Sequence, residues 1–226
     1  SVITNSETHV KKIIFHPKVL PSVVISDPEL TVGMPPFFTA GTGLDALSHC
    51  LEAYSSPFFH PMSQGIALEG MKLVFENLPR AYADGTDIEA RGNMMVAAAM
   101  GAVAFQKGLG AMHAMAHPVG ALYGTHHGMT NAVVMPEVLK MNRPAIEARI
   151  ADAAAYLGLA RSFDAFFDRV MALRAEMNVP ENLRALGAKD DRIDDLVAMA
   201  LEDPSAGGNP VTMTAENTRA LFEACL

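Results

Sequence analysis

Asp45 and His49 stand four residues apart in an apolar stretch, and both side chains are suited to metal binding or proton transfer. Residues four apart lie one above the other on the same face of a helix. Such a pair offers one oxygen and one nitrogen to a divalent cation. Each residue also has an ordinary alternative, because an Asp in a first helical turn usually caps the helix and a lone His is often a hydrogen-bonded core residue.

A second block of histidines lies further along the chain. His113 and His117 are again four residues apart, among Ala and Met, and the adjacent His126 and His127 follow. Burying a carboxylate without a partner costs several kcal/mol, and one divalent cation would satisfy most of these groups at once. The joint pattern therefore predicts a metal site. One carboxylate with imidazoles suits Fe²⁺ or Zn²⁺, whereas His126 and His127 could also be loop residues before a helix near Gly128.

The spacing of His113 and His117 is also that of the two ligands on a zinc protease helix. That motif needs a glutamate after the first histidine as general base, and Ala114 stands there. The hydrolase interpretation therefore lacks its base.

Composition bounds the class of protein. Half of the 226 residues are hydrophobic, with 15 Met and no Trp, and the net charge is −8. These features favour packed helices and argue against nucleic acids or anionic membranes as partners. We expect Cys50 and Cys225 to be reduced and buried. No apolar run reaches the ~20 residues of a membrane span, and no signal peptide opens the chain. We therefore expect a soluble, cytoplasmic protein.

The chain that must position these residues divides at about residue 33 into an extended part and a helical part. Before it, Val10–Phe15 and Ser22–Ser26 are predicted as short strands between prolines. Two strands without partners do not make a stable sheet, so residues 1–33 look like the end of a longer structure.

From residue 34 onward the pattern is helical. Thr42 is a plausible N-cap for the helix that carries Asp45, and the helix near 87–105 is apolar almost all round, which predicts a place in the middle of a bundle. The segment Asp203–Pro210 is predicted as a surface loop. We predict helices over residues 42–54, 61–78, 87–105, 110–121, 127–141, 144–157, 161–177, 191–201 and 214–225.

Two segments resemble the signature regions of a known family. Gly41–Tyr54, GTGLDALSHCLEAY, and Gly108–Ala121, GLGAMHAMAHPVGA, are similar to those of the iron-containing (group III) alcohol dehydrogenases. The similarity runs from about Val2 to the C-terminus. It implies a mainly α fold: an all-helical bundle, like the C-terminal domain of dehydroquinate synthase, over residues 34–226. Residues 1–33 would be an extended remnant of an absent α/β nucleotide-binding domain.

The resemblance also implies roles for single residues. Asp45, His49, His113 and His127 match the four metal ligands of the family. His117 matches a histidine beside the nicotinamide, which makes it the candidate catalytic and cofactor-binding residue. Lys11 and the segment Gly33–Met34 match positions near the cofactor, and the alternative for Lys11 is a solvated charge on a strand.

Two departures from the family pattern matter. His126 stands where the family usually has a proline, so the loop could supply the wrong histidine to the metal. The chain also has no Gly-rich phosphate-binding turn between a strand and a helix, which suggests that roughly the first half of the enzyme is absent.

For the complete enzyme, the resemblance implies reversible hydride transfer between an alcohol or aldehyde and NAD or NADP, with Fe²⁺, or alternatively Zn²⁺, as Lewis acid. It allows a homodimer. The choice between NAD and NADP stays open, because the residue that reads the ribose belongs to the absent half. Two rivals remain: a metal-dependent hydrolase, and a non-catalytic helical module whose polar cluster only fixes the core.

Overall fold

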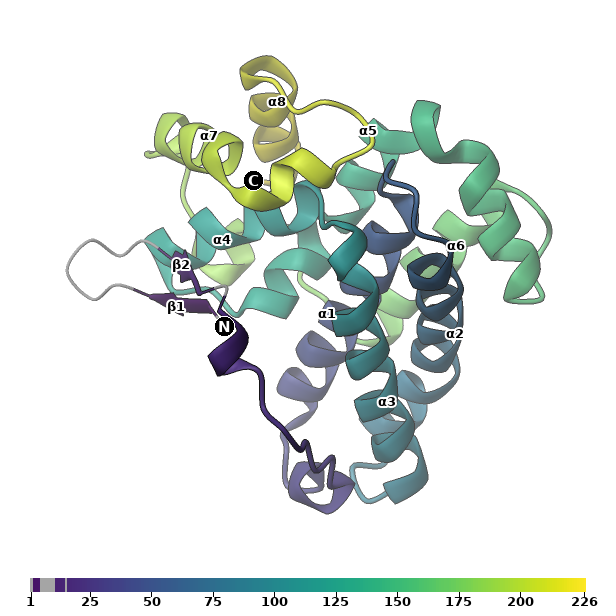
Figure 1. Cartoon of the computed structure of the whole chain (residues 1–226). Helices are drawn as coiled ribbons and strands as arrows, with labels where there is room; N and C mark the ends of the chain where they lie inside the picture. The colour runs from purple at the N-terminus through teal and green to yellow at the C-terminus, as the bar shows by residue number, and fades with distance from the viewer. Residues whose placement is uncertain (1, 5–10, 15) are drawn as a thin grey trace.

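The computed structural model describes residues 2–4, 11–14 and 16–226, and for most of the strand residues only the backbone. Within these residues, helices form one body and a short N-terminal segment precedes it (Figure 1). The α-helices are α1 Pro36–Ser55, α2 Pro61–Ala83, α3 Ile88–Ala104, α4 Ala111–Tyr123, α5 His127–Tyr156, α6 Phe163–Glu176, α7 Ile193–Glu202 and α8 Ala215–Cys225. The 3₁₀ turns are η1 Pro17–Val19, η2 Pro28–Thr31, η3 Phe105–Lys107, η4 Arg184–Leu186 and η5 Pro204–Gly208.

The N-terminal segment carries two short strands. β2 (Lys11–Ile13) confirms the core of the strand predicted over Val10–Phe15, whose two end residues lie outside the described part of the chain. It pairs antiparallel with β1 (Val2–Thr4), which the sequence did not predict.

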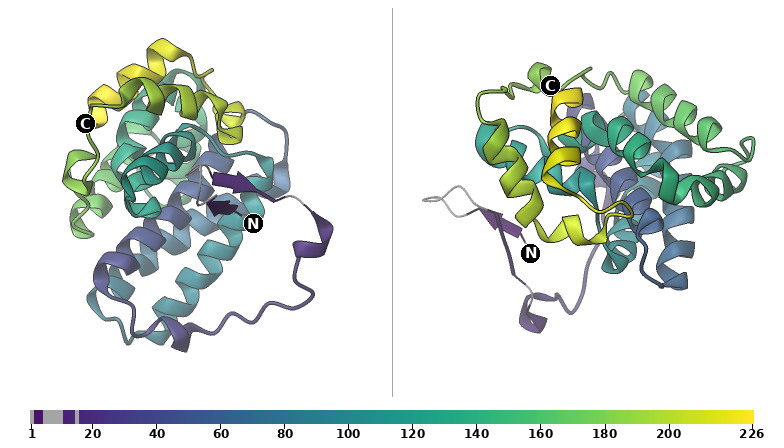
Figure 2. Two further views of the ribbon diagram at one scale, coloured as in Figure 1. Left: turned by 90° about the vertical axis from the view of Figure 1, so that its left-hand side faces the viewer. Right: turned by 90° about the horizontal axis from the view of Figure 1, so that it is seen from above.

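The strand predicted over Ser22–Ser26 was wrong. Val23, Val24 and Ile25 are 77%, 73% and 86% exposed, and no described strand lies beside them to pair with their backbone. The segment runs along the outside of the helical body (Figure 2). No described residue before Thr39 is buried, which agrees with a division near residue 33, although the boundary itself stays a prediction.

Helix α1 is the centre of the body, and it packs against α2, α3 and α5. It begins at Pro36 and not after Thr42, because proline suits the first turn of a helix, where its missing N–H is not needed. The predicted cap was therefore wrong: Thr42 lies within the helix, and its Oγ1 donates to the carbonyl of Phe38 at 2.8 Å. Asp45 is consequently a mid-helix residue and not a cap.

Two cations close the C-terminal end of α1. The Lys107 ammonium donates to the carbonyls of Ala53, Tyr54 and Ser56 at 2.9, 3.2 and 2.7 Å, and Arg149 donates to the carbonyls of the last residues of the helix and of Ser56. These carbonyls are the ones that a helix end leaves without partners, and they carry its negative dipole. Burial lowers the pKa of Lys107 to about 8.

Helix α5 continues through two prolines where the sequence predicted two helices, 127–141 and 144–157. Pro136 has no N–H to offer the carbonyl of Ala132, one turn earlier. That carbonyl is instead bonded by Nε of Arg174 from α6, at 2.8 Å. The side chain thus replaces the missing backbone donor, and the helix is not forced to end.

The same arrangement recurs in α2, which continues past Leu78, its predicted end, through Pro79. The carbonyl that Pro79 leaves without a donor is that of Phe75, and it accepts from Nη2 of Arg169 at 3.2 Å. Two arginines of α6 therefore support two proline-containing helices. They do so because α6 packs against α5 and contacts α2.

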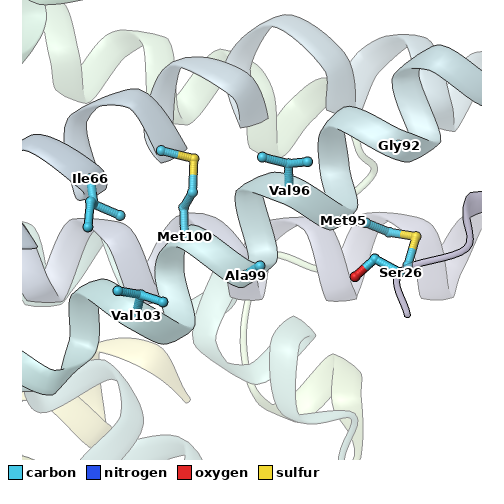
Figure 3. Close-up of a pocket in the computed structure, with 8 residues that line it drawn as sticks. All are labelled: Ser26, Ile66, Gly92, Met95, Val96, Ala99, Met100 and Val103. Carbon is cyan, nitrogen blue, oxygen red and sulfur yellow. The ribbon is translucent and has the colours of Figure 1, made fainter. Parts of the chain in front are cut away.

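Helix α3 differs from its prediction as a helix in the middle of the bundle. Its Ala97, Gly101 and Ala104 face α1 and α2, whereas Val96 and Val103 are 50% and 54% exposed. The outward side chains line a shallow apolar hollow of about 480 Å³ (Figure 3). Apolar residues on all sides of a helix therefore did not mean burial on all sides.

The C-terminal part confirms its predicted helices but not its loop. Helix α8 begins with a capping box between Thr214 and Asn217. Asp203–Pro210 is not a surface loop, because it folds as η5 with Ser205 and Asn209 only 7% exposed. Cys50 and Cys225 are buried free thiols, as predicted, and burial raises the pKa of each to about 12.

Among the described residues, no single helix is long and apolar enough to cross a membrane. One pair, Ile88–Lys107 with Ala111–Tyr123, reaches that length and composition only together, and the two members meet at 108°.

The arginine support of α5 predicts a dependence between two positions. Arg174→Met should lower the free energy of unfolding by ~1–3 kcal/mol, because it leaves the buried carbonyl of Ala132 without a donor. In a Pro136→Ala background the backbone N–H at position 136 serves that carbonyl, so the same substitution should cost clearly less. Urea denaturation of the four proteins measures the coupling. Equal costs in both backgrounds would contradict the interpretation, and Arg192→Met, at an exposed ion pair, is the matched control.

Candidate metal centre

The cluster of polar side chains lies where α1, α4 and α5 meet. Two glycines permit this close approach. A Cβ at Gly128, next to His127, would collide with the carbonyl oxygen of Gly41, and a Cβ at Gly101 of α3 would lie 2.9 Å from Cβ of His49. Gly128 brings the helix that carries Asp45 and His49 within reach of His127, and Gly101 lets α3 pack against the same helix beside His49.

Helix α4 carries His113 and His117, and side chains from elsewhere hold its N-terminus. Gly110 stands at its N-cap position and has no side chain to cap it. Oε1 of Glu52 accepts from the N–H of Met112 at 2.6 Å, and Oδ1 of Asn209 accepts from the N–H of Ala111 at 3.1 Å. A side chain of α1 and the side chain that follows the turn η5 therefore fix the start of α4.

Glu52 also orients the first histidine of α4. Its Oε2 lies 2.7 Å from Nδ1 of His113, and the two side chains are 4% and 2% exposed. A carboxylate at Nδ1 places the proton on that nitrogen and leaves Nε2 as the acceptor. Nε2 of His113 points to the carboxylate of Asp45, which it approaches to 3.8 Å from Oδ1.

Three donor atoms converge at this point. Oδ1 of Asp45 lies 3.5 Å from Nε2 of His127 as well as 3.8 Å from Nε2 of His113, and donor atoms of the three residues lie within 4.8 Å of one another. Neighbouring ligand atoms in a tetrahedral site are ~3.3–3.5 Å apart, because each lies ~2.0–2.1 Å from the ion. The two carboxylate-to-imidazole distances fit that requirement.

His49, the fourth predicted ligand, lies at the edge of this group. Its Nε2 is 3.9 Å from Oδ2 of Asp45, and its ring stacks on that of His113 with 4.7 Å between centroids. The structure thus places all four predicted ligands together, with His49 on the far oxygen of the carboxylate. Their role as ligands remains a prediction.

The neighbouring histidines His126 and His127 have different surroundings. His126 is the N-cap of α5: its Nδ1 accepts from the N–H of Met129 at 3.2 Å, and its ring contacts Phe37 and Phe38. His127 is the one whose ring faces the cluster, 5.2 Å from that of His113 between centroids. The concern that the loop offers the wrong histidine is therefore not supported by the geometry.

The electrostatics of the cluster favour an ionised carboxylate. Burial alone would raise the pKa of Asp45, but His49, His127 and His113 hold it below its ordinary value. Burial lowers the pKa of His49 to about 4, because Asp45 offsets only part of the penalty. Burial would also lower the pKa of His113, but Glu52 and Asp45 outweigh it and raise that pKa. An ionised Asp45 and a neutral His49 are the forms that bind metals.

His117, the predicted catalytic residue, lies one helical turn after His113. Its Nδ1 is 2.7 Å from Oδ2 of Asp203, and its ring stacks on that of His127 with 5.3 Å between centroids. Burial would raise the pKa of Asp203, but hydrogen bonds from His117 and Ser205 keep it low. The pairing leaves Nε2 of His117 as the nitrogen that can meet a ligand.

The two predicted cofactor contacts are less informative. Met34 stands just before α1, half-buried, with its carbonyl 3.5 Å from Oγ1 of Thr39. Lys11 has its backbone in β2, and its side chain lies outside the described part of the structure. The prediction for both residues stays as it was.

The donor set fits a divalent transition metal. One carboxylate and two or three imidazoles suit Fe²⁺ or Zn²⁺. In metal centres the second ring nitrogen of a ligand histidine typically contacts another carboxylate, as Nδ1 of His113 contacts Glu52 here.

Several residues that hold this centre were missed from the sequence. Glu52 lies seven residues after Asp45 and three after His49, so helical spacing put it on the same face and was a usable signal. Asn131, four residues after His127, carried the same signal. Asp203 and Asn209 gave none, because their contacts with α4 bridge about 90 residues of sequence.

Comparisons with known proteins place the chain in a family. Residues 39–226 match the model of the Fe-containing alcohol dehydrogenase family, C-terminal. The 4-hydroxybutyrate dehydrogenase of Cupriavidus necator is 40% identical over 222 residues, which cover 94% of this chain and 58% of that protein. This chain therefore spans about three fifths of that relative.

Two solved structures share the fold. The crystal structure of a 1,3-propanediol oxidoreductase has a TM-score of 0.93 and 37% identity, covering 100% of this chain and 61% of its own. A sulfoacetaldehyde reductase from Bifidobacterium kashiwanohense, solved in complex with NAD⁺, has a TM-score of 0.90 and 30% identity, covering 100% and 60%.

The geometry predicts which histidine substitution removes the metal. His49→Ala should abolish stoichiometric uptake of Zn²⁺ or Fe²⁺, because it removes an imidazole beside Asp45. His60→Asn is the matched control: His60 only caps α2, where its Nδ1 accepts from the N–H of Ser63, and Asn is itself a good N-cap. Dialysis followed by elemental analysis measures both. Equal metal content in the two variants would contradict the assignment of His49.

The low pKa of His49 predicts how stability depends on pH in protein stripped of metal. Between its ordinary value of 6.5 and about 4, the unfolded chain holds the proton and the folded chain does not. Acidification through this window should therefore lower the free energy of unfolding, by up to about 3 kcal/mol. His113, whose pKa is raised, acts only above pH 6.5.

Urea denaturation at pH 6.5 and pH 4.5 tests this expectation, with His49→Gln as the comparison. The variant should lose less stability than the parent on acidification. Parallel losses in both proteins would show that another group is responsible.

Proposed function

Since the chain belongs to the Fe-containing alcohol dehydrogenase family, we propose that it is the metal-binding part of a nicotinamide-dependent alcohol dehydrogenase. The reaction would be reversible hydride transfer between an alcohol and NAD or NADP. The observation that carries the proposal is the convergence of Asp45, His113 and His127, whose donor atoms lie within 4.8 Å of one another.

The proposal assigns separate tasks to the residues of the centre. Asp45, His49, His113 and His127 would hold the metal, and Glu52 would keep Nε2 of His113 directed at it. When bound, a divalent cation supplies Lewis acidity toward the alcohol oxygen and the nicotinamide accepts the hydride. Asp45 is suited to its task because its pKa is held low, so it stays a carboxylate.

His117 would handle the proton of the alcohol. Asp203, 2.7 Å from Nδ1, fixes the orientation of its ring. Nε2 is then the atom that takes the proton from the alcohol or returns it, a role for which imidazole is suited near neutral pH. The stacking of His117 on His127 keeps this nitrogen next to the metal centre.

The coenzyme and the substrate follow from the same proposal. Lys11 and Met34 would contact the nicotinamide coenzyme, together with residues outside this chain. The NAD⁺ complex of the reductase from B. kashiwanohense supports this coenzyme class. Relatives that act on 4-hydroxybutyrate and 1,3-propanediol support a small alcohol or aldehyde as substrate. The assembly would be a homodimer, in the cytoplasm.

The hydrolase alternative is not favoured by the surroundings of the metal centre. Ala114 occupies the position of the required base. Glu52, the glutamate that contacts this centre, already accepts from the N–H of Met112 and contacts Nδ1 of His113. Both of its oxygens are therefore engaged in supporting α4 and His113.

A chimera tests the function. The part of the C. necator 4-hydroxybutyrate dehydrogenase that precedes the matched region would be fused to this chain, loaded with Fe²⁺ or Zn²⁺ and assayed for NAD reduction with small alcohols. The chimera should be active, whereas the 226-residue chain alone should not be, because a hydride acceptor must be held within ~3–3.5 Å of the substrate carbon.

In the chimera, His117→Ala should retain the metal and lose ~10²–10⁴-fold in rate, as expected for a lost proton-transfer group. His49→Ala should lose both metal and activity. Turnover by the 226-residue chain alone would contradict the half-enzyme interpretation. Loss of metal in His117→Ala would show that His117 is a ligand instead.

A further inference from the structure

Asn131 lies inside the metal centre but belongs to no group assigned so far. It stands on α5, one turn after His127 and on the same face, and its side chain is completely buried. A buried amide normally has partners at both its oxygen and its nitrogen, since an unsatisfied polar atom costs ~1–3 kcal/mol.

The nitrogen of this amide lies among the three candidate ligand atoms. Nδ2 of Asn131 is 2.8 Å from Oδ1 of Asp45 and 3.3 Å from Nε2 of both His113 and His127. An NH₂ group has two hydrogens, and here it faces three electron-rich atoms. It therefore lies next to all three atoms to which a cation would be attracted.

The oxygen of the same amide has no such engagement. Oδ1 of Asn131 is buried and has no hydrogen-bond partner among the described residues. Turning the amide about its Cβ–Cγ bond exchanges nitrogen and oxygen within nearly the same volume, so no neighbour needs to move. The turn breaks no hydrogen bond of Oδ1, and the contacts of Nδ2 with Asp45, His113 and His127 are the ones it exchanges for a contact with the cation.

We infer that Asn131 is a further metal ligand, whose amide turns so that Oδ1 faces the cation. The inference rests on the proposed function, because it takes Asp45, His113 and His127 as ligands. Amide hydrogens are positive and are repelled by a cation, whereas an amide oxygen is a good donor to a hard divalent ion. Asn131 raises the number of donors above the four that Zn²⁺ prefers, which favours Fe²⁺.

Metal titration of chelator-treated protein tests the inference, with Zn²⁺ for affinity and Co²⁺ as a spectroscopic probe. Asn131→Asp keeps an oxygen and loses the NH₂, whereas Asn131→Leu loses both. We expect Asn131→Asp to bind at least as tightly as the parent and Asn131→Leu to bind ~10–100-fold more weakly. Asn77→Leu, at another buried asparagine remote from the centre, is the matched control and should bind normally.

The Co²⁺ absorption spectrum separates a ligand from a support. Loss of a donor changes the coordination number, so Asn131→Leu should differ in spectrum from the parent, and Asn131→Asp should resemble it. Unchanged spectra in all variants, or unchanged affinity in Asn131→Leu, would overturn the inference while the metal site itself stands. Absence of any metal uptake by the parent chain would instead overturn the proposed function and the inference with it.

Discussion

The metal centre depends on one buried carboxylate, that of Glu52. Its two oxygens join the last turn of α1 to the start of α4, one through the N–H of Met112 and the other through the ring of His113. A charge so deeply buried is tolerable only where donors surround it, and the positive end of a helix dipole provides them. The position of α4, the orientation of His113 and hence the direction in which its Nε2 points all follow from this contact.

The remaining supports come from parts of the chain that are distant in sequence. Asp203 and Asn209, in the last quarter of the chain, hold His117 and the first turn of α4. Lys107 and Arg149 close the C-terminal end of α1. The helix that carries Asp45 and His49 is therefore fixed at the end from which Glu52 reaches α4. All four candidate ligands lie on helices, so the geometry of the centre does not depend on a loop.

The sequence predicted the features that depend on local spacing. Asp45 and His49 share a face because they are four residues apart, and most helices were found because their apolar residues recur at helical spacing. The prediction failed where the structure of a segment depends on contacts with a distant part of the chain. The end predicted for α2 at Leu78 is absent because Arg169 serves the carbonyl of Phe75, which Pro79 leaves without a donor. The loop predicted over Asp203–Pro210 is half-buried because it packs against α4. Likewise, α3 is apolar all round, yet its outer face is uncovered in the described part of the chain.

The support of prolines by the arginines of α6 has a consequence for how the sequence can change over time. A lineage that replaces Pro136 first gains a backbone donor and can afterwards lose Arg174 without harm. A lineage that loses Arg174 first must pass through a protein with an unpaired carbonyl in its core. The two residues, 38 positions apart, are thus tied to an order of substitution. The same order of substitution holds for Arg169 and Pro79. The arginines of α6 can therefore be lost only after the prolines of the helices that they support.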